Sequence, residues 1–175
     1  MFRITTRWLL SISLMFAFAL PLQAAQLTQP SFKESWQDVG EAHLKVFWFD
    51  VYNAVLRTPT GRFDGYDAPL QLCLDYQRKI RKKMLLDETR KHLNPLATQA
   101  KVERWMLELQ QMWPSVKEGD QIAFQIDEQG KGHFFFNQTW IGTMKDPEFS
   151  PAFVKIWLGR SSMFPELAEK LRGGQ

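Results

Sequence analysis

Apolar residues fill both alternating sets of positions between His43 and Arg57, a pattern typical of a strand that is covered on both faces. One set holds Leu44, Val46, Trp48, Tyr52, Ala54 and Leu56, and the other holds Phe47, Phe49, Val51 and Val55. The segment has roughly fifteen residues, whereas strands usually have about 3–10. It therefore predicts a long central strand, or two strands joined by a bulge near Asp50.

The remaining periodicity separates strands and helices into blocks along the chain. The predicted elements are an extended arm at 26–38, a half-buried strand at 69–77, helices at 84–93 and 98–113, strands at 121–128 and 133–146, and two short helices within 147–174. The strand at 133–146 is expected to break at Asn137–Gln138. This block order predicts an α+β fold in a single domain.

Residues 1–24 have the layout of a secretory signal peptide, with a basic start followed by an apolar run. That run, from Trp8 to Leu20, is shorter than the about 20 residues that span a bilayer comfortably. We therefore predict cleavage near Ala24, export to the periplasm, and no stable membrane span afterwards. The alternative is an uncleaved anchor. The mature protein would be one domain covering residues 25–175.

The charge balance of the mature chain is nearly neutral. The whole chain has 22 Lys+Arg and 19 Asp+Glu, and the leader holds two of the arginines and no acidic residue. No nucleic-acid or anionic membrane partner is implied by this balance. The basic stretch Arg78–Lys83 is interpreted as a solvated connection or first helical turn, because no aromatic residue is interleaved for base stacking.

Few residues are arranged in patterns that carry chemistry. His43, His92 and His133 have no short mutual spacing and no cysteine cluster beside them, so we predict no metal and no cofactor. The single Cys73 lies in a strand pattern and is expected to be buried. Tyr52, inside an apolar strand, needs a hydrogen-bond partner if it is buried, so it is either a structural latch or a pocket group.

The predicted helix at 98–113 has one broad apolar stripe. Its members recur at helical spacing: Val102, Trp105, Met106, Leu109, Met112 and Trp113. The stripe predicts core packing on a sheet, the wall of an apolar ligand pocket, or both.

Several segments together resemble a known family. They are VGEAHLKVFWFDVYNAVL, LQLCLDYQRKI, WPSVKEGDQIAF, FFFNQTWIGTMKDPEFSPAFVKIWLG and PELAEKL, and they follow the order seen in bacterial chalcone isomerase-like proteins. The resemblance spans nearly all of the mature chain. It implies a large antiparallel sheet backed by a layer of helices, with a ligand cleft between them.

Plant enzymes of this fold close a chalcone to a flavanone with an arginine, a threonine, a tyrosine and an asparagine. Phe47 stands where the resemblance places the threonine, and Met84 and Lys91 stand where it places the tyrosine and the asparagine. The strand start has no arginine, and His43 or Lys45 would have to supply the cation. The catalytic set is not recognisable, so we predict no catalytic residue.

Other members of the fold bind fatty acids without catalysis, and the resemblance implies the same here. We predict an exported, non-catalytic protein that binds a small apolar ligand, such as a fatty acid, between the sheet and the helices. The candidate ligand-binding residues are Phe47, Trp48, Tyr52, Tyr76, Trp105 and Met106.

Two alternatives stay open. One is an isomerase or lyase acting on another substrate, with Tyr52, Tyr76 or His43 as acid or base. The other is an interaction protein that contacts an envelope partner through the basic segment QRKIRKK, residues 77–83.

Overall fold

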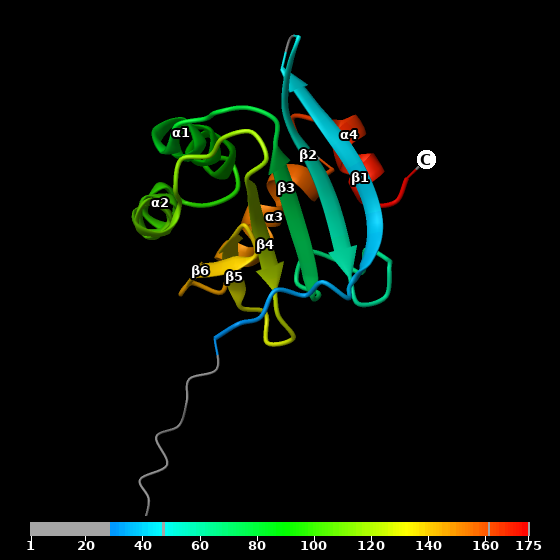
Figure 1. Ribbon diagram of the computed structural model, residues 1–175. Helices are drawn as coiled ribbons and strands as arrows, with labels where there is room; N and C mark the ends of the chain where they lie inside the picture. The colour runs from blue at the N-terminus through cyan, green and yellow to red at the C-terminus, as the bar shows by residue number, and fades with distance from the viewer. Residues whose placement is uncertain (1–28, 47, 161, 175) are drawn as a thin grey trace, which may run out of the picture.

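The computed structural model describes residues 29–46, 48–160 and 162–174, and the predicted leader lies outside this part. Six antiparallel strands form one sheet in the order of the chain, β1 to β6 (Figure 1). The strands are β1 Gln37–Val46, β2 Phe49–Thr58, β3 Leu70–Tyr76, β4 Gln121–Ile126, β5 Gly132–Phe136 and β6 Thr139–Thr143. Every strand therefore pairs with its neighbour in sequence.

Four helices complete the described fold: α1 Lys82–Leu93, α2 Gln99–Met112, α3 Phe149–Leu158 and α4 Pro165–Leu171. In Figure 1, α3 lies behind the sheet, α4 lies behind β1, and α1 and α2 lie beside the β4–β6 end. The prediction of an α+β fold with an antiparallel sheet backed by helices is confirmed. Among the described residues, no helix has the length and apolarity needed to cross a membrane.

The predicted long central strand is wrong, because the chain reverses between Val46 and Phe49. These two residues pair with each other, and β1 and β2 form a hairpin at the edge of the sheet. The alternative of two strands with an irregularity near Asp50 was nearer to the structure. Leu44 pairs with Tyr52 whereas Lys45 pairs with Asp50, so Val51 is an extra residue on β2.

This bulge explains why the hairpin looked like one strand. A reversal with Val46 opposite Phe49 would pair even-numbered residues with odd-numbered ones. The extra residue Val51 restores pairing of even with even, so Leu44 and Tyr52 face the same side. The alternation across the turn therefore reads as one uninterrupted pattern. We call the side that carries Leu44 and Tyr52 the inner face, and the opposite side the outer face.

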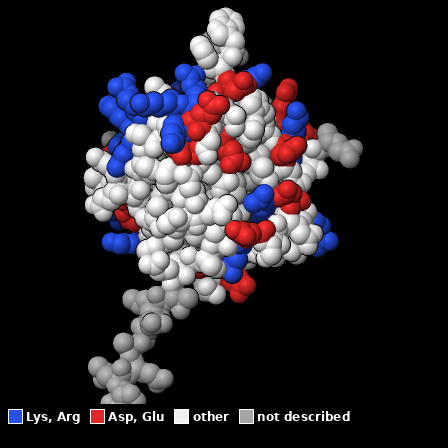
Figure 2. Space-filling model, viewed as in Figure 1, with Lys and Arg blue, Asp and Glu red and all other residues white. Residues whose placement is uncertain are grey.

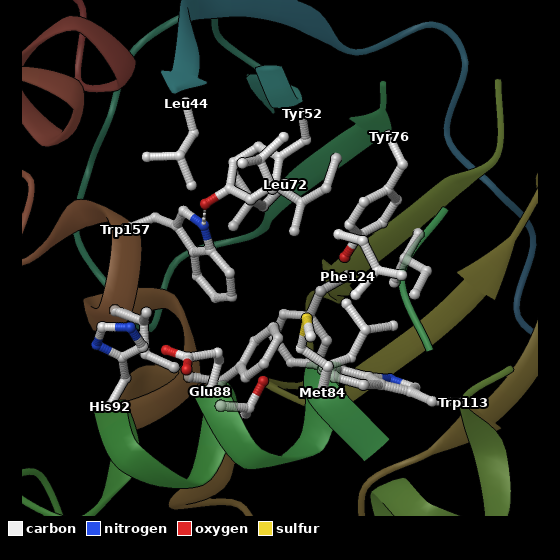
Figure 3. A pocket seen from close by; sticks show the side chains of 18 of the residues that line it. Leu44, Tyr52, Leu72, Tyr76, Met84, Glu88, His92, Trp113, Phe124 and Trp157 are labelled. Carbon is white, nitrogen blue, oxygen red and sulfur yellow. Dashed lines mark hydrogen bonds between the residues drawn. The ribbon is translucent and has the colours of Figure 1, made fainter. Parts of the chain in front are cut away.

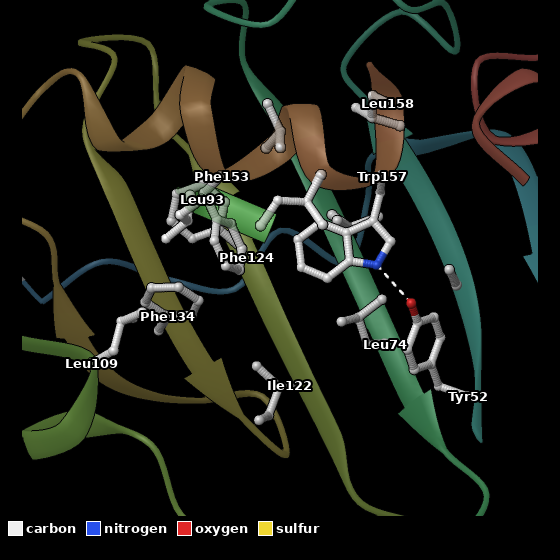
Figure 4. Close-up of a cluster of buried hydrophobic side chains, with 14 of the residues drawn as sticks. Tyr52, Leu74, Leu93, Leu109, Ile122, Phe124, Phe134, Phe153, Trp157 and Leu158 are labelled. Atoms are coloured by element: carbon white, nitrogen blue, oxygen red, sulfur yellow. Dashed lines mark hydrogen bonds between the residues drawn. The ribbon is translucent and has the colours of Figure 1, made fainter. Parts of the chain in front are cut away.

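The inner face and α3 form the main core (Figure 4). The centroid of the Phe153 ring on α3 lies 4.8 Å from that of the Phe124 ring and 5.2 Å from that of the Phe134 ring. Such edge-to-face pairs of aromatic rings add stability beyond the area they bury. Almost every residue of α3 is buried, which explains why its sequence is apolar on nearly all sides.

The outer face is also covered near its centre, so the prediction that β3 is only half-buried is wrong. The arm at residues 29–33 lies across it: the Phe32 ring is 5.5 Å from the Phe135 ring, and Gln125 Nε2 donates to the Ser31 carbonyl at 3.3 Å. Cys73 is buried under this arm, as predicted. Burial raises the pKa of the Cys73 thiol to about 12, which keeps it protonated and unreactive.

Candidate functional site: an apolar cavity with a basic mouth

A cavity of about 1080 Å³ lies between the inner face of the sheet, α1 and α3 (Figure 3). Its floor consists of even-numbered strand residues, including Leu72, Leu74 and Phe124, which the strand period of two places on the inner face. Trp157 and Phe153 of α3 close one side. The lining is therefore mostly aliphatic and aromatic.

Helix α1 forms the wall opposite the sheet. Met84, Leu85, Glu88, Thr89 and His92 all line the cavity, and their spacing places them on one face of the helix. The family resemblance pointed to Met84 and Lys91 on this helix, but Glu88, Thr89 and His92 were not predicted, because a helix normally exposes such residues to solvent. A mixed polar and apolar face on a helix beside an apolar sheet was the available signal.

Two tyrosines bring hydroxyl groups to the cavity. Trp157 Nε1 donates to the Tyr52 hydroxyl at 2.8 Å, and the rings of Tyr52 and Tyr76 lie edge to face with centroids 5.9 Å apart. Among the described residues, the Tyr76 hydroxyl has no hydrogen-bond partner, and in Figure 3 it points into the cavity. It is a donor that an oxygen atom of a ligand could accept from.

Both tyrosines stay protonated near neutral pH. Burial raises the pKa of Tyr52 to about 12, partly offset by the hydrogen bond from Trp157. Burial also raises the pKa of Tyr76, and the neighbouring Tyr52 raises it further. Neither hydroxyl is therefore suited to act as a general base.

Basic residues surround the mouth of the cavity. Lys45 from the β1–β2 hairpin, Arg78, Lys79 and Arg81 from the β3–α1 connection, and Lys91 from α1 all contribute to the lining. Glu88 is an acidic member of the lining, and its carboxylate lies 3.6 Å from Lys91 Nζ. The mouth therefore carries an excess of positive charge beside an apolar interior.

The structure brings together two of the predicted ligand-binding residues, Tyr52 and Tyr76, in the cavity wall. Trp48 lies at the hairpin turn, where 83% of its surface is exposed. Phe47 lies outside the described residues.

Two predicted residues on α2 lie in the core rather than in the cavity lining. The rings of Trp105 and Phe149 lie edge to face with centroids 5.4 Å apart, and Trp105 Nε1 donates to Asp146 Oδ2 at 2.9 Å. Met106 is also buried in the core. Of the apolar stripe on this helix, Trp113, just beyond its end, reaches the cavity. Core packing is thus the main role of the stripe.

The residues considered for chemistry are separated by the sheet. His43 is on the outer face, where its ring bonds to Asn53 and, at 2.6 Å, to Asp50 Oδ1. Lys45, Met84 and Lys91 do line the cavity. Among the described residues, no group of three or more His, Cys, Asp or Glu side chains is placed to hold a metal ion.

Comparisons with known proteins agree with this architecture. The fold is similar to the crystal structure of a fatty-acid binding protein from Arabidopsis thaliana, with a TM-score of 0.66, 8% sequence identity, and coverage of 83% of this chain and 91% of that chain. At this identity the likeness shows the fold alone. No curated protein matches the chain. A family model described as chalcone isomerase-like matches residues 39–173, most of the chain. The protein therefore belongs to the chalcone isomerase-like family.

Proposed function

We propose that the protein binds a small apolar ligand with an acidic head, such as a fatty acid, and that it does so without catalysis. The observation that carries this proposal is the cavity of about 1080 Å³, with its apolar interior and basic mouth. Ligand pockets usually measure about 300–1,000 Å³ and are mainly apolar, with a few polar groups that fix orientation. A fatty-acid chain therefore fits in both size and chemistry.

The polar groups favour one orientation of such a ligand. Tyr76 ends β3, and Arg78 and Lys79 follow it at the mouth. A carboxylate at this end could accept from the Tyr76 hydroxyl while lying near the basic side chains, an arrangement that strengthens hydrogen bonds. The acyl chain would then extend inward along Phe124 and Phe134, whose rings belong to the cavity wall.

The absence of catalysis is part of the proposal. Met84 and Lys91 occupy the positions where the family resemblance places a catalytic tyrosine and asparagine. The two tyrosines in the cavity have pKa values raised by burial, so both stay protonated at neutral pH and neither is available to accept a proton. The similarity in fold to a fatty-acid binding protein supports a binding role as well.

We further propose that the protein is exported and works in the periplasm after cleavage near Ala24. The layout of residues 1–24 supports this. N-terminal sequencing of the protein from its native host should begin near Ala25, whereas a chain that still begins with Met1 would contradict export by cleavage.

Ligand binding can be tested by blocking the cavity. Leu74 lines it from β3, so in Leu74→Phe the larger ring extends into open space instead of overpacking the core. Delipidated protein should bind hexadecanoic acid in a calorimetric titration, and Leu74→Phe should weaken that binding by about tenfold or more, because the ring occupies part of the ligand volume.

The matched control is Leu107→Phe, the same substitution at a position on α2 that is 63% exposed. It should leave the affinity unchanged. Native mass spectrometry of protein purified from its own cells should also show a bound acyl species. Absence of hexadecanoate binding by the delipidated wild-type protein would contradict the proposal.

A further inference from the structure

We propose that the mouth of the cavity docks onto an anionic phospholipid surface. The docking surface consists of Trp48 and Phe49 at the β1–β2 turn, Arg78, Lys79 and Arg81 in the β3–α1 connection, and Met84 at the start of α1. These residues come from three separate segments. Arg78, Lys79, Arg81 and Met84 line the cavity, and the turn joins them where Phe49 lies against Arg78.

The apolar part of this surface is open to solvent. Trp48 is 83% exposed, and Phe49 and Met84 are each 53% exposed. Single exposed apolar residues are ordinary on protein surfaces, but here Trp48 and Phe49 are adjacent at one turn. Tryptophan and phenylalanine are well suited to the boundary between headgroups and acyl chains, where tryptophan is enriched in membrane proteins.

The basic part lies directly beside the apolar part. The guanidinium group of Arg78 lies over the Phe49 ring, 4.7 Å from its centroid. Figure 2 shows blue Lys and Arg side chains gathered at the upper left, near the white projection at the top, with red acidic side chains directly beneath that projection. The aromatic residues that the basic segment lacks in sequence are thus supplied in space by the hairpin.

The charges on this segment are available to a partner. Among the described residues, Arg78, Lys79 and Arg81 form no ion pair within 4.0 Å, whereas Lys83 pairs with Asp87 at 2.6 Å. The nearby Asp50 is paired with Lys45 at 3.3 Å and with His43. The surface therefore offers unpaired cations next to exposed rings, which complements a bilayer of anionic lipids.

The position of the docking surface gives it a role in ligand exchange, and this step rests on the proposed function. Arg78, Lys79, Arg81 and Met84 line the cavity as well as the docking surface. A bilayer seated there would face the opening directly. An acyl ligand could then pass between membrane and cavity without crossing water, which strongly disfavours exposed hydrocarbon.

Docking can be tested on delipidated protein, so its outcome does not depend on ligand binding. The probes are vesicles of phosphatidylcholine alone and vesicles with added phosphatidylglycerol, used in co-sedimentation at low and high salt. Wild-type protein should partition onto the anionic vesicles about tenfold or more in excess of the neutral ones, and salt should weaken the binding.

The variant combines Arg78→Glu, Lys79→Glu and Arg81→Glu. Its matched control combines Lys33→Glu, Arg62→Glu and Lys131→Glu, which reverse three charges at exposed positions on other segments. The first set should lower partitioning onto anionic vesicles by about tenfold or more, and the control set should lower it far less. Thermal unfolding checks that both variants are folded.

Insertion of Trp48 into the bilayer is tested with brominated phosphatidylcholine mixed into the anionic vesicles. Bromine should quench part of the wild-type tryptophan fluorescence, and Trp48→Phe should remove that part. Equal vesicle binding by the two triple variants would overturn the proposal, as would quenching that survives Trp48→Phe. If the first triple variant lost a protein partner but kept its vesicle binding, the surface would serve protein contacts and the proposal would also fail.

Discussion

At the scale of single residues, one hydrogen bond links the sheet to the helix that crosses it. Trp157 Nε1 on α3 donates to the hydroxyl of Tyr52 on β2, and the pair is separated by 105 residues in sequence. Both side chains are also part of the cavity wall. Tyr52 is therefore both a structural latch and a pocket residue, the two interpretations that the sequence left open.

This bond leads to a prediction about stability. Tyr52→Phe removes the acceptor and leaves the buried Trp157 N–H unsatisfied, so the free energy of unfolding should fall by roughly 1–3 kcal/mol. Urea unfolding measures the change. Adding Trp157→Phe to the Tyr52→Phe variant removes the donor that had lost its acceptor. This second step should therefore lower the free energy of unfolding less than Trp157→Phe does in the wild-type protein. Additive effects of the two substitutions would show that the bond contributes nothing.

At the scale of elements, the β1–β2 hairpin is tied together by side chains on its outer face. The ring of His43 on β1 bonds to Asn53 and Asp50 on β2. These bonds raise the pKa of His43, the one to Asn53 most and the one to Asp50 next. Because the histidine is well exposed, solvent screens the ionic part of the interaction.

The pH dependence of this contact has a definite sign. A histidine whose pKa is raised in the folded state stabilises the fold fully below its ordinary value of 6.5, and this stabilisation is lost as the pH rises through the higher folded value. His43→Gln should therefore cost more stability well below pH 6.5 than well above it. Denaturant unfolding of both proteins across this range provides the measurement.

His92 provides a control for which the pH dependence of stability has the opposite sign. Burial lowers its pKa, so charging it works against the folded state at acidic pH. The free energy of unfolding of His92→Gln, relative to that of the wild-type protein, should therefore rise as the pH falls. If His43→Gln lowered the free energy of unfolding by the same amount across the pH range, the raised pKa of His43 in the folded state would be contradicted.

The same elements show what could be predicted from the sequence. The strand at Leu70–Tyr76, the helix at Gln99–Met112 and the break at Asn137–Gln138 followed from local spacing and turn chemistry, and the break has positive φ at both residues. The hairpin at Val46 and Phe49 did not, because the bulge at Val51 preserves the alternation through the turn.

The candidate site was predictable only in part, for a related reason. Tyr52 and Tyr76 were found because polar groups stand out within apolar strands. The wall formed by Glu88, Thr89 and His92 was missed, since its polar residues resemble a solvent-facing helix. Which helix lies over the open part of the sheet depends on tertiary packing, and sequence periodicity does not carry that information.

At the scale of the whole molecule, the first strand meets the last helix. A Cβ atom added to Gly40 on β1 would collide with the backbone carbonyl groups of Lys170 and Leu171 on α4. Backbone atoms cannot move aside as a flexible side chain can. The close approach therefore requires glycine at this position.

Gly40→Ala should consequently force α4 away from β1 and lower the free energy of unfolding by about 1–3 kcal/mol. Hydrogen exchange should show faster exchange in α4 and β1 and little change in β4 and β5. Glu41→Ala is the matched control, because this neighbouring side chain is exposed and its removal should leave exchange in α4 unchanged. Unaltered protection of α4 in Gly40→Ala would contradict this role of the glycine.

The contact between β1 and α4 also has a consequence for the order of folding. Because each strand pairs with the next, the sheet can grow hairpin by hairpin as the chain is delivered from its N-terminus. Strand β1 nevertheless packs against α4, the last helix of the chain, at Gly40. A chain whose synthesis stops before residue 165 would lack this contact, and apolar surface left exposed in a partly folded chain favours association with other chains. We therefore expect a chain truncated before α4 to aggregate more readily than the full chain, which light scattering would measure.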